Sequence, residues 1–93
     1  MELVYTKKLE LNEASDCKYK ELNLDYYLVA CESEGSRTYG IQINMTKDDG
    51  ELETALINDV LSSRTGMIEL IRLLYNNSVT PVSALDVIYD CIA

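Results

Sequence analysis

The fold of this chain is decided by the stretch "RTYGIQINMTKDDGELETALINDV" (residues 37–60). Its first half alternates apolar and polar side chains, which is typical of a strand that buries one face. The side chains expected to point into the core are Tyr39, Ile41, Ile43 and Met45, and those expected to point outward are Thr38, Gln42 and Asn44. The following pair, Asp49-Gly50, accepts the positive φ angles of a type I′ turn, so it predicts a hairpin into a second strand.

The segment "KDDGELE" (47–53) around that turn carries four carboxylates in seven residues. A calcium loop would place oxygen ligands at alternate positions over about twelve residues and end in a bidentate Glu. The segment lacks that register, so we interpret its acids as surface charge on a turn. The sequence predicts no metal site and no cofactor.

Two further strands are predicted upstream. Residues 3–11 alternate, with Lys7 interrupting the apolar face, and we expect its amine to stay in water at the strand edge. Residues 19–32 form a longer strand whose C-terminal half is apolar on both faces. The polar segment 33–36 is the hairpin turn between this strand and the next.

The period then changes to that of helices. Residues 62–77 place Met67, Leu70, Ile71 and Leu74 on one face, after a serine cap at position 62 or 63. A second short helix begins at Pro81. Its predicted apolar stripe is Val82, Leu85, Ile88, Tyr89 and Ile92. The chain is therefore expected to be a single α+β domain (residues 1–93), ββββαα, in which a four-stranded antiparallel meander carries both helices on one face.

Helices on one face leave the other face of the sheet uncovered. Val4, Tyr27 and Val29 are predicted to lie on it. Tyrosine suits both ordinary strand positions and interface anchors, so both interpretations of Tyr27 stay open. A partly apolar exposed face often marks an interface, which makes this face a candidate homodimer surface.

The charge balance limits the partners. The net charge is −8, which argues against direct binding of nucleic acid or of anionic membranes, and favours either solubility or a basic protein partner. Residues 48–93 hold eight acids against two bases. The acids predicted to form a partner-binding patch are Asp48, Asp49, Glu51, Glu53 and Asp59.

The residue types argue against an enzyme. The chain has no His and no Trp, its four glycines are isolated, and its carboxylate pairs fall in a predicted exposed turn. The three cysteines, Cys17, Cys31 and Cys91, are widely spaced, which fits free thiols in a reducing cytoplasm. No apolar run approaches the length of a membrane span, and no signal peptide is recognised.

The C-terminal segment "NNSVTPVSALDVIYDCI" (76–92) resembles the end of a family of small, uncharacterised Firmicutes proteins. The matching residues are Thr80, Pro81, Val82, Leu85, Asp86, Val87 and Asp90, and "YGIQI" (39–43) is similar to that family's central strand. This resemblance implies no activity. In size and acidity alone, the chain also resembles phage-encoded inhibitors such as anti-CRISPR proteins, some of which look like nucleic-acid mimics.

Two functional hypotheses follow. In the first, the chain is an inhibitor whose acidic patch docks on a basic protein, such as a nucleic-acid enzyme. In the second, it is a homodimeric regulatory or housekeeping protein that interacts through the apolar sheet face.

Overall fold

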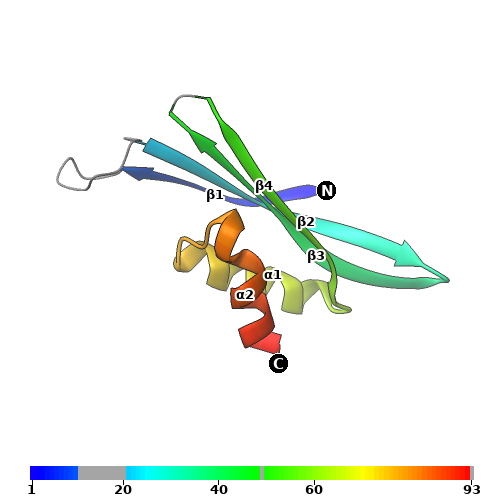
Figure 1. Cartoon of the computed structure of the whole chain (residues 1–93). Coiled ribbons are helices and arrows are strands. Elements are labelled where there is room, and N and C mark those ends of the chain that lie inside the picture. The colour runs from blue at the N-terminus through cyan, green and yellow to red at the C-terminus, as the bar shows by residue number, and fades with distance from the viewer. Residues whose placement is uncertain (11–20, 49, 93) are drawn as a thin grey trace.

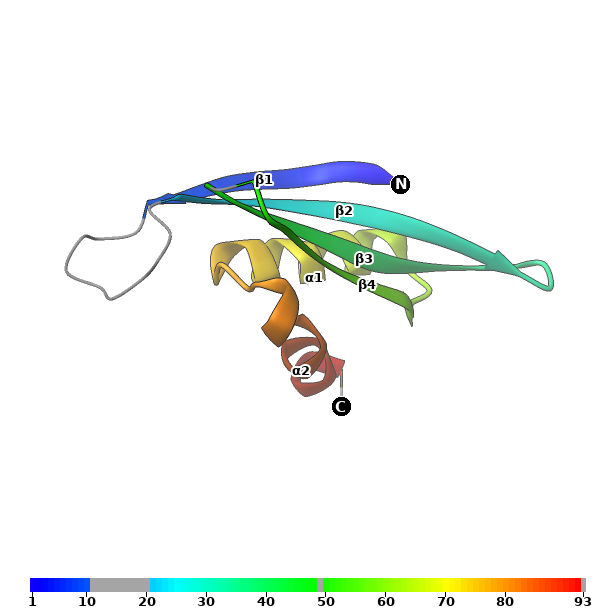
Figure 2. The ribbon, with the colours of Figure 1, turned by 45° about the horizontal axis from the view of Figure 1, so that its top comes forward.

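The computed structural model describes residues 1–10, 21–48 and 50–92. The elements are β1 (Glu2–Glu10), β2 (Glu21–Ser33), β3 (Ser36–Lys47), β4 (Leu52–Leu61), α1 (Arg64–Asn76) and α2 (Pro81–Ile92). The strands form one antiparallel sheet in the order β1-β2-β3-β4. Both helices lie on the same side of it (Figures 1 and 2). The predicted ββββαα arrangement is confirmed.

The hydrophobic core lies between the sheet and the helices. Successive side chains of a strand point to opposite faces, so alternate residues of β2 and β3 are buried. The buried residues are Leu24, Tyr26, Leu28, Ile41, Ile43, Met45, Met67, Leu70, Ile71, Leu74, Val79, Ala84 and Ile88. The predicted apolar face of α1 is confirmed, and the Ser63 hydroxyl caps this helix by accepting a hydrogen bond from the Gly66 N–H at 3.0 Å.

The turn between β2 and β3 is a type I′ turn, the type that the sequence predicts for the hairpin between β3 and β4. Ser33 pairs with Ser36, which leaves two residues in the loop. Glu34 and Gly35 have φ angles of 51° and 79°. Positive φ at both central residues is the requirement of a type I′ turn, whose twist matches that of the flanking strands.

The turn between β3 and β4 is longer than a type I′ turn. The Lys47 N–H donates to the Glu51 carbonyl at 2.8 Å, and the Gly50 N–H donates to the Lys47 carbonyl at 2.9 Å. Three residues therefore lie inside the loop, and Gly50 is left-handed at φ 88°. A three-residue loop needs only one such residue. The predicted hairpin is thus confirmed, and the prediction of a two-residue type I′ turn is wrong. Asp49 itself lies outside the described residues.

An irregularity in β1 corrects the predicted place of Val4. Leu3 pairs with Tyr27 and Tyr5 pairs with Tyr26, so Val4 is an extra residue between two consecutive partners. Such a bulge changes the face on which the side chains before it lie. Val4 packs against the core cluster and is not part of the open face. Leu3 lies beside Tyr27 on the open face in its place.

Lys7 also departs from its predicted role. Its amine does not remain in water: it donates hydrogen bonds to the Tyr75 carbonyl and, at 3.1 Å, to the Ser78 hydroxyl. It lies 4.3 Å from the centre of the Tyr75 ring, and that ring stacks on Tyr5. The last carbonyls of a helix have no partner within the helix and carry partial negative charge, so a cation stabilises them. Lys7 thereby joins β1 to the end of α1.

The orientation of α2 differs from the predicted one. Its buried residues are Pro81, Ala84 and Ile88. Of the predicted apolar stripe, Val82, Leu85 and Tyr89 are exposed. Among the described elements, the main contacts of the helix are with β4 and the neighbouring β3, and it runs away from the sheet (Figure 2). One narrow side of the helix therefore meets the core, and small residues such as Ala84 fit there.

Candidate interaction surfaces

The face of the sheet opposite the helices carries a row of side chains that crosses all four strands and is apolar on three of them; we call it the apolar row. The strand register aligns Leu3 with Tyr27, Tyr27 with Gln42, and Gln42 with Leu56. Leu3 and Leu56 are 51% and 53% exposed, and Tyr27 is partly exposed. Val29 lies on the same face, two residues beyond Tyr27 on β2. No described element covers this face (Figure 2).

A polar row lies beside the apolar one on the same face. Thr6, Asp25, Asn44 and Thr54 align across the four strands. The Thr6 hydroxyl donates to the Asp25 carboxylate at 2.6 Å. The Asn44 side-chain oxygen accepts hydrogen bonds from Gln42 at 3.0 Å and from Thr54 at 3.1 Å. These polar groups therefore form hydrogen bonds with one another and do not need a ligand to complete them.

The register between β3 and β4 shifts after Ile57, and this shift places Asp59. Asp59 has a φ of 56°, and its carboxylate accepts a hydrogen bond from the Thr38 hydroxyl. The β4 backbone comes so close to β3 that a Cβ on Gly40 would lie 2.1 Å from the Ile57 carbonyl oxygen. Gly40 is thus the residue that permits the shift.

Of the predicted acidic residues, Asp49 lies outside the described part of the chain, and the structure sets Asp59 apart from the other three. Asp48 and Glu51 are exposed at the β3–β4 turn, and Glu53 lies just beyond it on β4. Lys47 forms ion pairs with Glu51 at 3.6 Å and Glu53 at 3.1 Å, so a base neutralises part of this charge. Five residues of β4 lie between Glu53 and Asp59, and the six residue steps span about 20 Å along an extended strand. The predicted patch thus shrinks to the turn.

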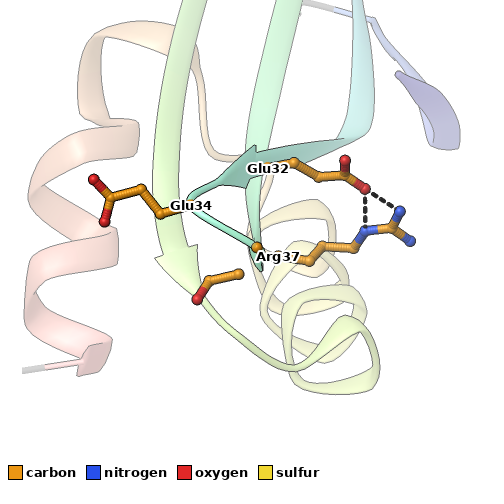
Figure 3. Close-up of a pocket in the computed structure, with 5 residues that line it drawn as sticks. Glu32, Glu34 and Arg37 are labelled. Carbon is orange, nitrogen blue, oxygen red and sulfur yellow. Dashed lines mark hydrogen bonds and ion pairs between the residues drawn. The ribbon is translucent and has the colours of Figure 1, made fainter.

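A shallow hollow lies at the tip of the β2–β3 hairpin (Figure 3). The residues that line it are Glu32, Glu34, Gly35, Ser36 and Arg37, and all of them are exposed. Glu32 accepts hydrogen bonds from Arg37, which raises the pKa of the guanidinium further. The Glu34 side chain points to the other side of the hairpin (Figure 3). An exposed ion pair already engaged with itself is poorly suited to acid–base chemistry.

Buried charges and clusters of metal-ligating side chains are absent from the described parts of the chain. Apart from the hydroxyl of Tyr26, no polar or charged side chain among them is buried, and no group of three or more His, Cys, Asp or Glu residues there could hold a metal ion. The strongest pKa shift belongs to Tyr26 in the core. Burial, and to a lesser extent the neighbouring Tyr75, raises the pKa of Tyr26 to about 12. Its hydroxyl donates to the Val79 carbonyl at 2.9 Å, which is a structural role.

Sequence reasoning missed two residues of the apolar row, Leu3 and Leu56. The signal for Leu56 was present, because Leu52, Thr54 and Leu56 alternate with the core-facing residues of β4. The signal for Leu3 was not, because only the bulge places it on this face. Of the three residues predicted for the face, the structure places Tyr27 and Val29 there and moves Val4 to the core side.

The fold and these surfaces define a small α+β protein of the ββββαα class. No described helix is both long enough and apolar enough to cross a bilayer. Residues 2–93 match a family of unknown function, DUF6514, and the chain belongs to this family. No curated protein and no solved structure shows significant similarity to it.

Proposed function

We propose that this protein is a non-enzymatic interaction module that docks on another protein through the open face of its sheet, and that the partner is a second copy of the chain. The observation that carries this proposal is the row formed by Leu3, Tyr27, Gln42 and Leu56. A tyrosine near the centre of a surface is a frequent anchor of interfaces, and the leucines beside it add apolar area that can be buried.

The charge distribution supports a second copy as the partner. The net charge of −8 opposes self-association in general. The apolar row itself carries no charge, however, and Asp25 lies beside it in the polar row. A two-fold dimer through this face would therefore bring apolar side chains together without directly opposing carboxylates.

The size of the open face is sufficient for such a pair. Strands about 4.8 Å apart that rise about 3.3 Å per residue give a face of about 19 by 30 Å for a sheet of four strands with at least nine residues each. Two copies would cover about 1,100 Å² in total, close to the lower limit of about 1,000 Å² for specific interfaces. We therefore expect a reversible dimer, not an obligate one.

The test is the mass of the protein in solution as a function of concentration. Tyr27→Glu should abolish dimerisation, because it places a carboxylate at the centre of the interface. Leu73→Glu is the matched control, since it changes an exposed leucine on α1 in the same way. Sedimentation velocity should show a dimer for the wild type and the control, and a monomer for Tyr27→Glu. A wild type that stays monomeric at high micromolar concentration refutes the proposal.

The acidic β3–β4 turn is the second candidate, and the exposed carboxylates of Asp48 and Glu51 favour it. In this version the protein is an inhibitor that docks on a basic nucleic-acid-binding protein in the cytoplasm, as its likeness in size and charge to anti-CRISPR proteins suggests. The likeness of residues 76–92 to small Firmicutes proteins points to the host in which to look for that partner. Because Lys47 pairs with Glu51 and Glu53, this surface carries less charge than the sequence predicts.

A nuclease-treated pull-down from such a host, eluted with salt, tests the second candidate. A basic partner should leave the wild type at a few tenths molar salt, because screening removes most of the attraction between exposed charges. The variant Asp48→Lys/Glu51→Lys should not retain that partner. The turn would be excluded as the docking site if this variant still retained the partner, or if elution of the partner did not depend on salt concentration.

A further inference from the structure

The outer side of α2 is a second surface, independent of the open sheet face. Val82 is 79% exposed, Tyr89 59% and Leu85 44%. These residues are three and seven positions apart, so they project from one side of the helix within an arc of about 60°. They form the apolar α2 row, defined as Val82, Leu85 and Tyr89.

Carboxylates border this row on its solvent side. Asp86 and Asp90 are exposed and lie on the next arc of the helix, turned away from the buried face. The described part of α2 contains no Lys or Arg. The surface therefore combines apolar anchors at helical spacing with negative charge along one border.

The apolar α2 row and its acidic border together favour one kind of binding partner over the others. A second copy is disfavoured, because pairing two α2 rows would bring the Asp86 and Asp90 carboxylates of both copies close together in a protein of net charge −8. An anionic membrane is disfavoured too, because helices that lie on membranes carry Lys and Arg beside the apolar face. A basic protein with an apolar groove complements both features of the row.

We propose that α2 is a recognition helix that inserts the Val82, Leu85 and Tyr89 side chains into an apolar groove on a partner protein, while Asp86 and Asp90 face Lys or Arg side chains at its rim. This is the helix-in-groove mode of recognition, in which residues about one and two turns apart act as anchors. The orientation of α2 fits the role, because the helix runs away from the sheet and presents its outer side (Figure 2).

A synthetic amphipathic peptide of leucine and lysine serves as the probe, because it offers an apolar surface rimmed by cations. A second peptide with glutamine in place of lysine removes the rim charge. Binding of the labelled peptides to the full chain is measured by fluorescence anisotropy at several salt concentrations. Amide chemical shifts locate the binding site.

The expected result is that the lysine peptide binds at least tenfold more tightly than the glutamine peptide and shifts the amides of α2. Val82→Gln/Leu85→Gln/Tyr89→Gln should weaken binding tenfold or more; these positions are exposed and Gln is a good helix former, so the fold should persist. Asp86→Asn/Asp90→Asn should weaken binding and flatten its salt dependence.

Matched variants separate this surface from others. Leu73→Gln changes a leucine on α1 that is as exposed as Leu85, and Glu34→Gln/Glu69→Gln removes two exposed acids elsewhere. Neither should alter the affinity. Failure of the wild type to bind the lysine peptide, shifts outside α2, or equal losses in the matched variants would overturn the proposal. None of these outcomes bears on dimerisation through the sheet, which the Tyr27→Glu variant tests separately.

Discussion

The buried hydroxyl of Tyr26 makes the stability of this protein depend on alkaline pH. The side chain is fully buried and donates a hydrogen bond to the Val79 carbonyl, in the segment between α1 and α2. Ionisation would put a charge in the core and replace this donor with an acceptor that faces a carbonyl oxygen. The pKa of Tyr26 is accordingly raised from 10.0 to about 12.

The sign and size of the effect follow from linkage between ionisation and folding. A raised folded-state pKa means that the unfolded chain releases the proton first, so the contribution of Tyr26 is complete below pH 10 and is lost as the pH rises toward 12. With pKa values of 10 and about 12, the free energy of unfolding should fall by about 1.4 kcal/mol at pH 11, since one pKa unit corresponds to about 1.36 kcal/mol.

Tyr26→Phe isolates this contribution. At pH 8 the variant should be less stable than the wild type by about 1–2 kcal/mol, because the Val79 carbonyl loses its buried partner. The variant has no phenol to ionise in the core, so the difference between the two proteins should shrink by about 1.4 kcal/mol between pH 9 and pH 11.

Urea denaturation followed by circular dichroism measures both free energies at each pH. Subtracting one protein from the other cancels the titration of lysines and of the other tyrosines. Tyr27→Phe is the control, because it removes a hydroxyl from the open face and keeps the buried phenol of Tyr26. If the wild-type and Tyr26→Phe curves run parallel up to pH 11, the reasoning from burial is wrong.

Three further variants test the contacts that hold the elements together. Gly40→Ala should destabilise the protein by about 1–3 kcal/mol in urea denaturation, because the added Cβ would lie 2.1 Å from the Ile57 carbonyl oxygen. Gly66→Ala is the control and should be neutral or stabilising, because its Cβ would meet nothing closer than 3.4 Å. Lys7→Met keeps the aliphatic stem but removes the donor at the end of α1, so thermal unfolding should report a loss of about 1–2 kcal/mol, and an unchanged midpoint would contradict the capping role. Glu34→Asn should raise the free energy of unfolding by about 0.5–1 kcal/mol, since Asn-Gly suits the positive φ angles of a type I′ turn better than Glu-Gly; a loss of stability would show that the turn is not of this type.

The sequence predicted the elements well because each one has a clear period. The helical spacing of Met67, Leu70, Ile71 and Leu74 places in the core the side chains that the structure buries. The alternation of residues 39–45 does the same for Ile41, Ile43 and Met45, whereas Tyr39 is only partly buried. Local patterns of this kind determine which face of an element is apolar. They also favour a meander where short turns join successive strands, as between β2 and β3 and between β3 and β4.

The predictions are wrong where a contact between residues far apart in the sequence determines the local structure. The bulge at Val4 depends on how β1 aligns with β2, which periodicity within β1 does not contain. Lys7 is an interruption of the apolar face in the sequence, and only the position of Tyr75, far along the chain, turns it into a helix cap. The placement of Asp59 differs for the same reason: closeness in sequence grouped Asp59 with Glu53, whereas a length of strand separates them.

The same consideration explains why α2 is the most informative error. Its sequence contains more apolar side chains than one narrow contact with β3 and β4 can bury, so a prediction that counts apolar residues assigns all of them to the core. The structure buries Ala84 and Ile88 and leaves the apolar α2 row in solvent. Exposed apolar side chains in a small domain cost solubility, and this chain carries carboxylates beside them. A helix whose apolar surface exceeds what its own domain covers is suited to contact a partner, and the α2 row is therefore the first surface at which to look for one.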